Sequence, residues 1–275
     1  MDNCQVVALC NQKGGVGKSF STASLGVGLA RTGKKVLLVD ADPQGSLGIS
    51  LGIGEPDELE VSLATVMAGV IEDKPLPPEA GILHHGEGVD LLPANIELSG
   101  LEVSLFSVMS REFVLRNCIE PLRQRYDYIL IDCMPSLGIM TVNALVAADS
   151  VIIPSQPSFL AAKGLDLLLH TVAKVRRSIN PRLKIDGVLL TMVDSRTNND
   201  REIVNELRTG VGQRLRVFDT VIPRSIRAVE ATRAGESIFA YDPNGKVAQA
   251  YAGLTKEVLD LEGRQKAEPR SERAR

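Results

Sequence analysis

The sequence predicts an α/β protein with a doubly wound, mostly parallel sheet and helices on both faces. Short apolar runs alternate with helical patterns along the chain, which is typical of parallel strands joined by right-handed crossovers. Hydrophobic residues make up 44% of the 275 residues, whereas Trp is absent and aromatic residues reach only 4%. A core of Leu, Val, Ile and Ala fits strands that are buried on both faces.

The elements follow one another in a regular order. Continuous apolar runs predict strands over residues 5–10, 35–40, 128–132, 150–154 and 185–192. Helical periodicity predicts helices over residues 18–32, 140–148, 160–179 and 246–261. Residues 54–87 are rich in Pro, Gly and acidic residues, which favours a variable surface. We expect one domain over residues 1–262 and a polar, disordered tail over residues 263–275.

Cysteine usage and the N-terminus indicate the compartment. Cys4, Cys10, Cys118 and Cys133 show no CxxC spacing, which favours reduced thiols over a disulfide framework. The N-terminus lacks the basic stretch and apolar run of a signal peptide, and no apolar segment approaches the ~20 residues of a membrane span. We therefore expect a cytoplasmic protein with no membrane partner.

The net charge of -3 hides an asymmetry along the chain. Residues 1–181 contain 14 basic and 20 acidic residues, whereas residues 182–233 contain 10 basic and 7 acidic ones. Residues 264–275 contain five basic and two acidic residues. Solvated surface charge is one interpretation, but a basic later half also suits a polyanionic partner.

A glycine-rich segment separates the first strand from the first helix. It reads Asn11-Gln12-Lys13-Gly14-Gly15-Val16-Gly17-Lys18-Ser19, close to the phosphate-loop pattern G-x-x-x-x-G-K-[ST] with Gln12 at the first glycine position. Glycines let backbone N–H groups face phosphate oxygens, and the helix N-terminus adds partial positive charge. We expect Lys18 to reach the β- and γ-phosphates and Ser19 to bind Mg²⁺. A glycine-rich turn with incidental lysines is the alternative.

Three aspartates stand at the ends of two predicted strands. Asp40 and Asp42 close the second strand, and Asp132 ends the run YILID in the manner of a Walker B acid. The carboxyl ends of parallel strands meet at the sheet edge where ligands bind. The aspartates therefore belong to the predicted nucleotide site, although each could instead cap a helix or stabilise a turn, Asp40 above all.

Five motifs together resemble one family. The segments KGGVGKS, LLVDADPQGS and YDYILIDCMPSLG resemble the ParA/MinD group of P-loop ATPases with a deviant Walker A motif, and TMVDSRTN and VIPRSIRAVEA resemble its ParA (Soj-like) partition branch. The resemblance extends over residues 5–261. It implies the P-loop NTPase fold, ATP and Mg²⁺ as cofactors, and slow, partner-stimulated hydrolysis of ATP to ADP and phosphate during plasmid, chromosome or mobile-element segregation.

The resemblance also assigns roles within the nucleotide site. In the family, a lysine matching Lys13 reaches across an ATP-bound sandwich dimer, and a glycine matching Gly14 lies where the two loops meet. Lys13, Lys18 and Asp42 are implied to be catalytic, with Asp42 positioning the attacking water. Asp132 is implied to hold Mg²⁺ through water, with Asp42 as a second candidate. The residues expected to contact the nucleotide are Lys13, Gly14, Gly15, Val16, Gly17, Lys18, Ser19 and Phe20.

The family binds DNA through surface arginines. The resemblance assigns non-specific double-stranded DNA binding to Arg196 and Arg227, with Arg224 as a weaker candidate. It implies a homodimer, a ParB-like centromere-binding partner and association with the nucleoid in the ATP-bound state. Because the first strand begins by Gln5, we expect no preceding helix-turn-helix domain and no sequence-specific operator binding.

The sequence departs from the family pattern in three places. Family members usually carry three threonines after the loop lysine, whereas this chain has Ser19-Phe20-Ser21; a serine can still bind Mg²⁺. Met134 replaces a proline after the Walker B strand, a change without a physical explanation. The segment between Arg196 and Arg227 is slightly longer than usual, which affects the assignment of both arginines.

Three other functions compete. A membrane-dependent ATPase of the MinD type would need a terminal amphipathic helix, whereas the apolar stripe of residues 246–261 suits a helix packed on the body. A reductase like the nitrogenase iron protein would use cysteines such as Cys118 and Cys133 at a cluster. The third alternative is a scaffold that coats DNA and is switched by the bound nucleotide, in which ATP hydrolysis only resets the scaffold.

Overall fold

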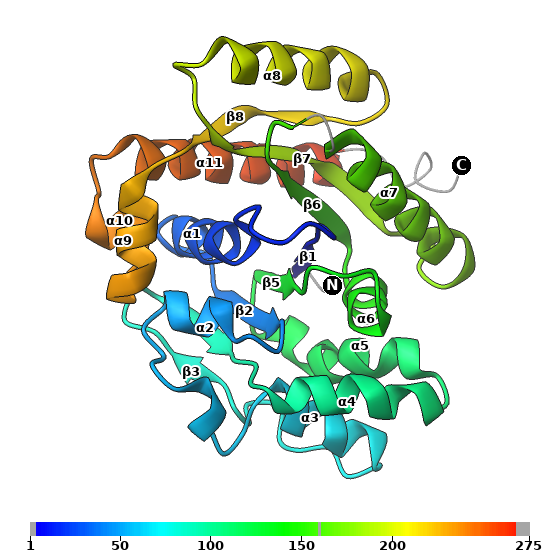
Figure 1. Ribbon diagram of the computed structural model, residues 1–275. Helices are drawn as coiled ribbons and strands as arrows, with labels where there is room; N and C mark the ends of the chain where they lie inside the picture. The colour runs from blue at the N-terminus through cyan, green and yellow to red at the C-terminus, as the bar shows by residue number, and fades with distance from the viewer. Residues whose placement is uncertain (1–3, 159–160, 268–275) are drawn as a thin grey trace.

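The computed structural model describes residues 4–158 and 161–267. Its sheet has the strand order β3-β4-β2-β5-β1-β6-β7-β8 (Figure 1). The pairs are parallel except for β3 with β4. The strands are β1 Gln5–Leu9, β2 Val36–Ala41, β3 Leu83–His84, β4 Val89–Leu92, β5 Tyr128–Cys133, β6 Ser150–Ser155, β7 Lys184–Val193 and β8 Val217–Pro223.

Helices and short 3-10 turns connect the strands. The α-helices are α1 Lys18–Ala30, α2 Ser46–Ser50, α3 Leu63–Ile71, α4 Glu97–Ser104, α5 Val114–Ile119, α6 Ile139–Ala147, α7 Ala161–Ser178, α8 Asn198–Gly210, α9 Ile226–Ala234, α10 Ile238–Tyr241 and α11 Lys246–Ala267. The 3-10 turns are η1 Pro56–Glu58, η2 Leu105–Ser107, η3 Arg111–Phe113, η4 Glu120–Gln124 and η5 Val211–Gln213.

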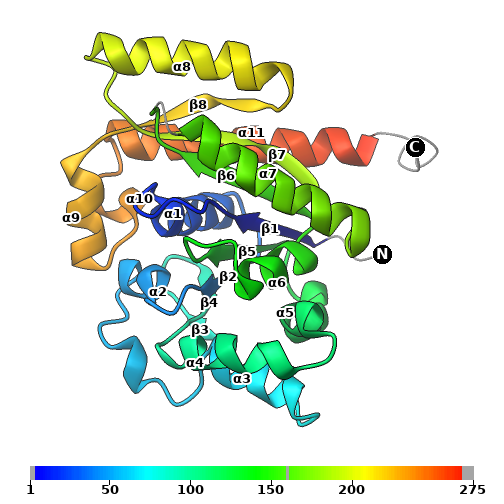
Figure 2. The same cartoon turned by 45° about the vertical axis from the view of Figure 1, so that its right-hand side comes forward.

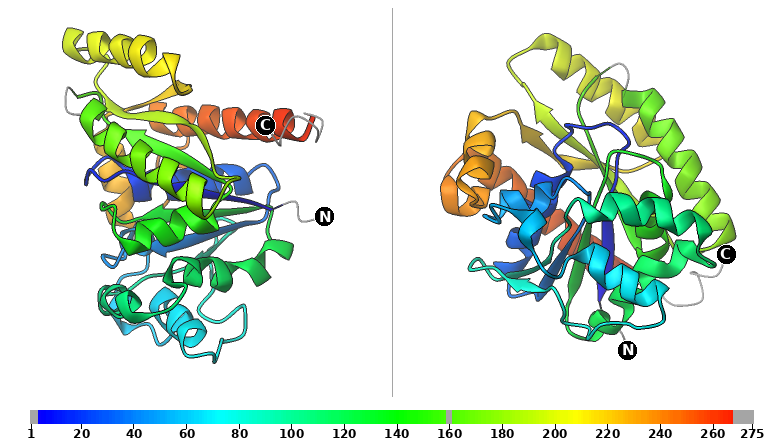
Figure 3. Two further views of the ribbon diagram at one scale, coloured as in Figure 1. Left: turned by 90° about the vertical axis from the view of Figure 1, so that its right-hand side faces the viewer. Right: turned by 60° about the horizontal axis from the view of Figure 1, so that its bottom comes forward.

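The sheet separates two hydrophobic cores. Side chains alternate between the faces, so that Val6 and Ala8 of β1 enter one core and Val7 and Leu9 enter the other. Helices α3, α5, α6 and α7 cover the first core, and α1, α10 and α11 cover the second (Figures 2 and 3). The continuous apolar runs of the sequence therefore reflect strands buried on both faces.

β1 lies between β5 and β6 in the middle of the sheet. At this strand the connecting helices change from one face of the sheet to the other. The helix after β1, α1, covers one face, whereas the helix after β5, α6, covers the other. Ligands of doubly wound sheets bind beyond the carboxyl ends of the strands at such a point. The glycine-rich loop after β1 lies there.

The predicted doubly wound fold is confirmed, with differences in detail. Strands β3, β4 and β8 and helices α2, α3, α4, α5, α8, α9 and α10 were not predicted. Most of them are short or contain interrupted apolar patterns, whereas α3 is apolar but lies in a segment whose Pro, Gly and acidic residues favoured a surface. Residues 54–87 include α3, whose Leu63 and Met67 are fully buried, so this segment is not only surface. The predicted helix over 160–179 is α7, Ala161–Ser178, and residue 160 lies outside the described residues.

The C-terminal helix corrects one expectation. α11 continues to Ala267, past the predicted end at residue 261 and into the predicted polar tail. Extending an existing helix costs little, and Arg, Gln, Lys and Ala are good helix formers. Residues 268–275, the rest of that tail, lie outside the described residues. Within the described ranges, no helix is both long and apolar enough to cross a membrane.

Candidate nucleotide-binding site

The loop between β1 and α1 takes the shape of a phosphate loop. Gly15 and Gly17 adopt φ values of 68° and 79°, in the left-handed region that glycine enters without strain. Asn11 fastens the start of the loop: its Nδ2 donates to the Pro154 carbonyl at 2.7 Å, and its Oδ1 accepts from the Lys13 N–H at 2.9 Å.

Two further side chains hold the loop from neighbouring strands. The Gln156 Nε2 donates to the Gly15 carbonyl at 2.8 Å, and the Thr191 Oγ1 donates to the Val16 carbonyl at 2.8 Å. With these carbonyls engaged from outside, the loop can direct N–H groups toward an anion. The sequence prediction missed Gln156 and Thr191, because nothing in their local pattern shows that they contact a loop so distant in sequence.

The N-terminus of α1 is prepared for an anion. Its N-cap, Gly17, offers no side-chain hydrogen bond, and the first turn contains no acidic residue. The first N–H groups of a helix have no partner within the helix, and they carry partial positive charge. Lys18 is buried, and its Nζ lies 3.5 Å from the Lys13 carbonyl. The loop, helix end and lysine together form a site for phosphate groups.

Asp132, at the end of β5, faces the same site. Its Oδ1 accepts from Thr22 Oγ1 at 3.4 Å, whereas its buried Oδ2 has no hydrogen-bond partner within the described ranges. Burial raises the pKa of Asp132 to about 7, although the nearby Ser19 hydroxyl and Lys18 charge favour the ionised form. A cation at the free oxygen would stabilise that form.

Magnesium fits this donor set. The described residues hold no cluster of three His, Cys, Asp or Glu side chains suited to a metal. Mg²⁺ is usually held by one or two carboxylates together with waters and substrate phosphates, and does not need an all-protein cage. The orphan oxygen of Asp132, the Ser19 hydroxyl and a phosphate loop meet that requirement.

Asp40 and Asp42 have different surroundings. Asp40 is fully buried and accepts backbone N–H groups from Asp42 at 3.2 Å, Leu47 at 3.0 Å and Gly48 at 3.2 Å. Burial and the nearby Asp132 carboxylate raise the pKa of Asp40. Asp40 therefore joins the end of β2 to the first turn of α2, which is a structural role like the one predicted as the alternative for Asp40. Asp42 is 9% exposed and accepts from the Gln44 N–H at 3.0 Å.

Lys13 and Gly14 are exposed on the loop. A Cβ placed on Gly14 would lie 3.8 Å from Pro135, an ordinary contact. A Cβ at this position therefore does not clash within the monomer. The absence of a side chain at Gly14 is not explained by packing within one chain.

A cavity of about 610 Å³ continues from the loop. It begins at Gly17 and Phe20 and extends to Met192 and Pro223, at the ends of β7 and β8. Thr191, Arg224 and Tyr251 also line it. This cavity could not be predicted from the sequence, because its walls come from five segments that are far apart along the chain. Its position, beyond the phosphate loop, suits the nucleoside of a bound nucleotide.

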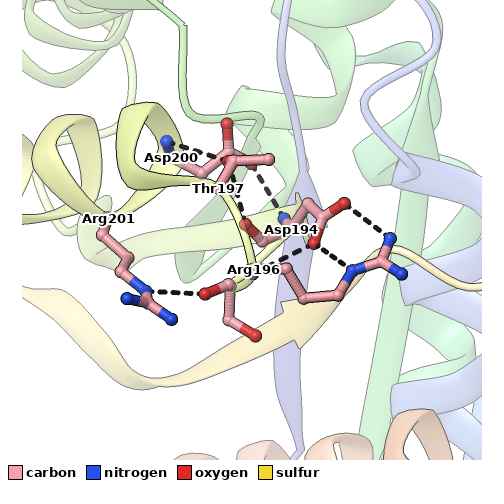
Figure 4. Close-up of polar contacts among 6 residues, drawn as sticks. Asp194, Arg196, Thr197, Asp200 and Arg201 are labelled. Carbon is pink, nitrogen blue, oxygen red and sulfur yellow. Dashed lines mark hydrogen bonds and ion pairs between the residues drawn. The ribbon is translucent and has the colours of Figure 1, made fainter.

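The three candidate DNA-binding arginines follow the ends of two strands: Arg196 comes after β7, Arg224 directly after β8, and Arg227 in the first turn of α9. The Arg224 N–H donates to the Val193 carbonyl at 3.0 Å, which joins the two strand ends. Arg196 is held by Asp194 through its Nε at 2.9 Å and its Nη2 at 2.8 Å (Figure 4). Arg227 forms an ion pair of 3.0 Å with Glu230. All three arginines are exposed.

Two cysteines are neighbours in the structure. Cys10 directly follows β1, and Cys133 is the last residue of the adjacent strand β5. Both are buried free thiols, and their sulfur atoms are 2.7 Å apart. Cys118 is buried in the core from α5. This arrangement gives no support to the reading in which Cys118 and Cys133 bind a cluster at a twofold axis.

The doubly wound sheet, the loop at its switch point and the lysine at the helix N-terminus define a P-loop nucleotide-binding protein. Comparisons with known proteins agree with this class. The family described as AAA domain matches residues 4–185. Among curated proteins, the sporulation initiation inhibitor protein Soj of Bacillus subtilis is 43% identical over 254 residues, which cover 92% of this chain and 98% of Soj.

The chromosome partitioning protein ParA of Caulobacter vibrioides is 41% identical over 260 residues, covering 94% of this chain and 95% of ParA. The solved structure of cobyrinic acid a,c-diamide synthase from Mycobacterium smegmatis, with bound ADP and magnesium, has a TM-score of 0.83 and 37% identity. The match covers 97% of this chain and 98% of that one. The chain belongs to the ParA/Soj family of partition ATPases, which confirms the resemblance found in the sequence.

Proposed function

We propose that this chain is a DNA-partitioning ATPase in which ATP binding drives a sandwich dimer that binds DNA non-specifically, and hydrolysis to ADP releases the DNA. One observation carries the proposal: among the described residues, the buried Oδ2 of Asp132 has no hydrogen-bond partner, and this carboxylate lies near Lys18 at the N-terminus of α1, which has no side-chain cap. A carboxylate, an ammonium group and free helix N–H groups together suit a magnesium–triphosphate group.

ATP would bind with its phosphates in the loop and its nucleoside in the cavity. The relative with 37% identity holds ADP and magnesium in its solved structure, which supports this choice of ligand and cofactor. Loop residues 13–20 would surround the phosphates, and Lys18 would contact the β- and γ-phosphates. Ser19, and Asp132 through water, would hold Mg²⁺, which when bound neutralises charge on the phosphate oxygens.

Hydrolysis would depend on Asp42. Asp42 is 9% exposed whereas Asp40 is fully buried, and Asp40 accepts from the Asp42 N–H, so Asp42 would orient a water molecule for attack. The fully buried Asp40 has its oxygens committed to backbone N–H groups. This difference favours Asp42 over Asp40 as the catalytic carboxylate.

Dimerisation would complete the site. Lys13 and Gly14 are exposed, and Gly14 tolerates a Cβ within the monomer, so both suit a contact between two loops. Lys13 would then place its charge at the partner's phosphates, as an arginine finger does. Because each subunit adds its own arginines, the dimer would also double the phosphate contacts available to DNA.

Two relatives carry names that refer to chromosome partitioning or sporulation control. By analogy we expect a ParB-like centromere-binding partner that stimulates slow ATP turnover, and a cytoplasmic protein that associates with the nucleoid when ATP is bound. The apolar stripe of α11 does not suit a membrane anchor, because Val247, Tyr251, Leu254 and Val258 are buried.

The deciding experiment measures binding to duplexes of unrelated sequence with ATP, with ADP and without nucleotide, at low and moderate salt. We expect tight binding only with ATP, equal on all sequences, with Lys18→Ala as the control that loses it. Binding that is independent of ATP, or confined to one sequence, would contradict the proposed function. ATP turnover measured in the same samples, with and without Mg²⁺, tests the enzymatic part.

A further inference from the structure

An aromatic pair lines the cavity at the point where it leaves the phosphate loop. Phe20 of α1 lies edge-to-face against Tyr251 of α11, with ring centroids 5.7 Å apart and an interplanar angle of 66°. Phe20 is half-buried, and both rings line the 610 Å³ cavity. A residue that directly follows the predicted Mg²⁺ ligand Ser19 therefore brings an aromatic ring to the wall of the cavity.

Tyr251 and its hydrogen bond hold the Phe20 ring in place. Tyr251 is 1% exposed, and its hydroxyl lies 2.9 Å from Ser21 Oγ, so α11 is bonded to the residue next to Phe20. The edge-to-face contact then restricts the Phe20 ring. Because a restricted side chain loses little rotamer freedom when a ligand arrives, its contact with that ligand is effective.

Met192 also lines the cavity, and its position is fixed by the backbone and by a hydrogen bond. Met192, at the end of β7, adopts a φ of 54°, which is unusual for a residue with a side chain. Its sulfur accepts from Gln156 Nε2 at 2.8 Å, the same group that holds the Gly15 carbonyl of the loop. Gln156 therefore holds the Met192 side chain in place in the wall of the same cavity that the aromatic pair lines.

We propose that Phe20, held by Tyr251, is a nucleoside-contacting residue that makes this chain's nucleotide affinity depend on the base and ribose as well as on the phosphates. A flat ring beside an apolar cavity favours the face or edge of a nucleobase. This inference rests on the proposed function, because it takes the phosphate loop to hold the phosphates. It goes beyond the family pattern, which has threonine where this chain has Phe20.

The test compares ligands with and without a nucleoside. In the presence of Mg²⁺, dissociation constants are measured for ATP, ADP and inorganic tripolyphosphate. We expect Phe20→Leu to weaken ATP and ADP by about tenfold, the low end of ring–base stacking, and to leave tripolyphosphate binding unchanged. Phe20→Tyr, which keeps the ring, should restore nucleotide affinity.

The matched control is Phe239→Leu. Phe239 is buried in the same core and faces α1 at Gly28, but it does not line the cavity. The Phe239→Leu variant should have a lower melting temperature but unchanged affinities for ATP, ADP and tripolyphosphate. If Phe20→Leu only lowers stability, or weakens ATP and tripolyphosphate equally, the ring acts through packing and the proposal is wrong.

A second variant does not depend on Phe20→Leu folding. The chain contains no Trp and four Tyr residues, so Phe20→Trp introduces a single tryptophan at the cavity, which can be excited selectively at wavelengths that tyrosine does not absorb. Saturating ATP and ADP should change its emission, whereas tripolyphosphate should not; an unchanged emission with ATP overturns the proposal. If wild-type protein binds no tripolyphosphate and Lys18→Ala leaves ATP affinity intact, the phosphate site itself is wrong, which is a separate failure.

Discussion

The phosphate loop and the arginine-bearing ends of β7 and β8 lie at the same edge of the sheet but are built differently. The loop is fastened by Asn11, Gln156 and Thr191, and Lys18 is buried. The arginines are exposed, and Arg196 and Arg227 are paired with carboxylates of their own chain. Replacing a buried group that is held by several hydrogen bonds should therefore reduce ligand binding strongly, whereas an exposed ion pair contributes little to stability by itself.

The largest effect should come from Lys18→Ala. The change removes the only loop ammonium buried beside Asp132, so the phosphate charges lose their main partner within the described chain. We expect ATP affinity to fall by roughly 100-fold or more, as charge-assisted hydrogen bonds are lost. The loss of affinity is measured by titration with a fluorescent ATP analogue. Wild-type affinity in the Lys18→Ala variant would contradict the assignment of the phosphate loop.

Asp42→Ala should separate binding from catalysis. ATP binding should remain, because the phosphate contacts are intact, but turnover should fall by about 100-fold since the water loses its orienting carboxylate. Phosphate release under saturating ATP measures the loss. Wild-type turnover would show that another group orients the water. Asp40→Asn serves as the comparison: it should lower the melting temperature, because one oxygen no longer accepts from Leu47 and Gly48.

Gly14→Val tests the dimer contact. A Cβ at this position makes only an ordinary contact with Pro135 inside the monomer, so folding should be nearly unchanged. We expect ATP binding to persist and the ATP-dependent dimer to be lost. Size-exclusion chromatography with ATP, in the Asp42→Ala background, measures the dimer. A normal dimer would place the contact between subunits elsewhere.

Arg196→Ala and Arg227→Ala should weaken DNA binding several-fold and leave the ATP-dependent dimer intact. Each removes one phosphate contact per subunit, so the slope of log affinity against log salt should become shallower by about two in a dimer. Losses should be equal on unrelated sequences, because phosphate contacts carry no base information. A loss on one sequence only would indicate base readout, and no loss would move the DNA surface to Arg224 or to residues 264–275.

Asp194→Asn should have the smallest effect. In the free protein Asp194 occupies the Arg196 guanidinium, and this pairing holds the pKa of Asp194 at about 2. Both groups are therefore charged at neutral pH, and removing the negative charge should raise DNA affinity by about twofold. Glu230→Gln, beside Arg227, is the parallel variant. Weaker DNA binding in both would mean that the carboxylates position the arginines for DNA.

The sequence predicted the phosphate loop well because its function depends on local backbone geometry. Glycines at 15 and 17 and a lysine at the start of α1 act through neighbours a few residues away. The roles of Asp40 and Asp42 were less evident, since they depend on which carboxylate folding buries. Asp40 proved to be the buried one, bonded to backbone N–H groups.

The amino-acid sequence by itself determined the doubly wound class, the phosphate loop and its family, because periodicity and short motifs are properties of consecutive residues. Only the tertiary structure decided which distant residues complete the site. Gln156 and Thr191 hold carbonyls of the loop, and Tyr251 packs against Phe20. These contacts join segments more than a hundred residues apart, and the strand order β5-β1-β6-β7 brings them together.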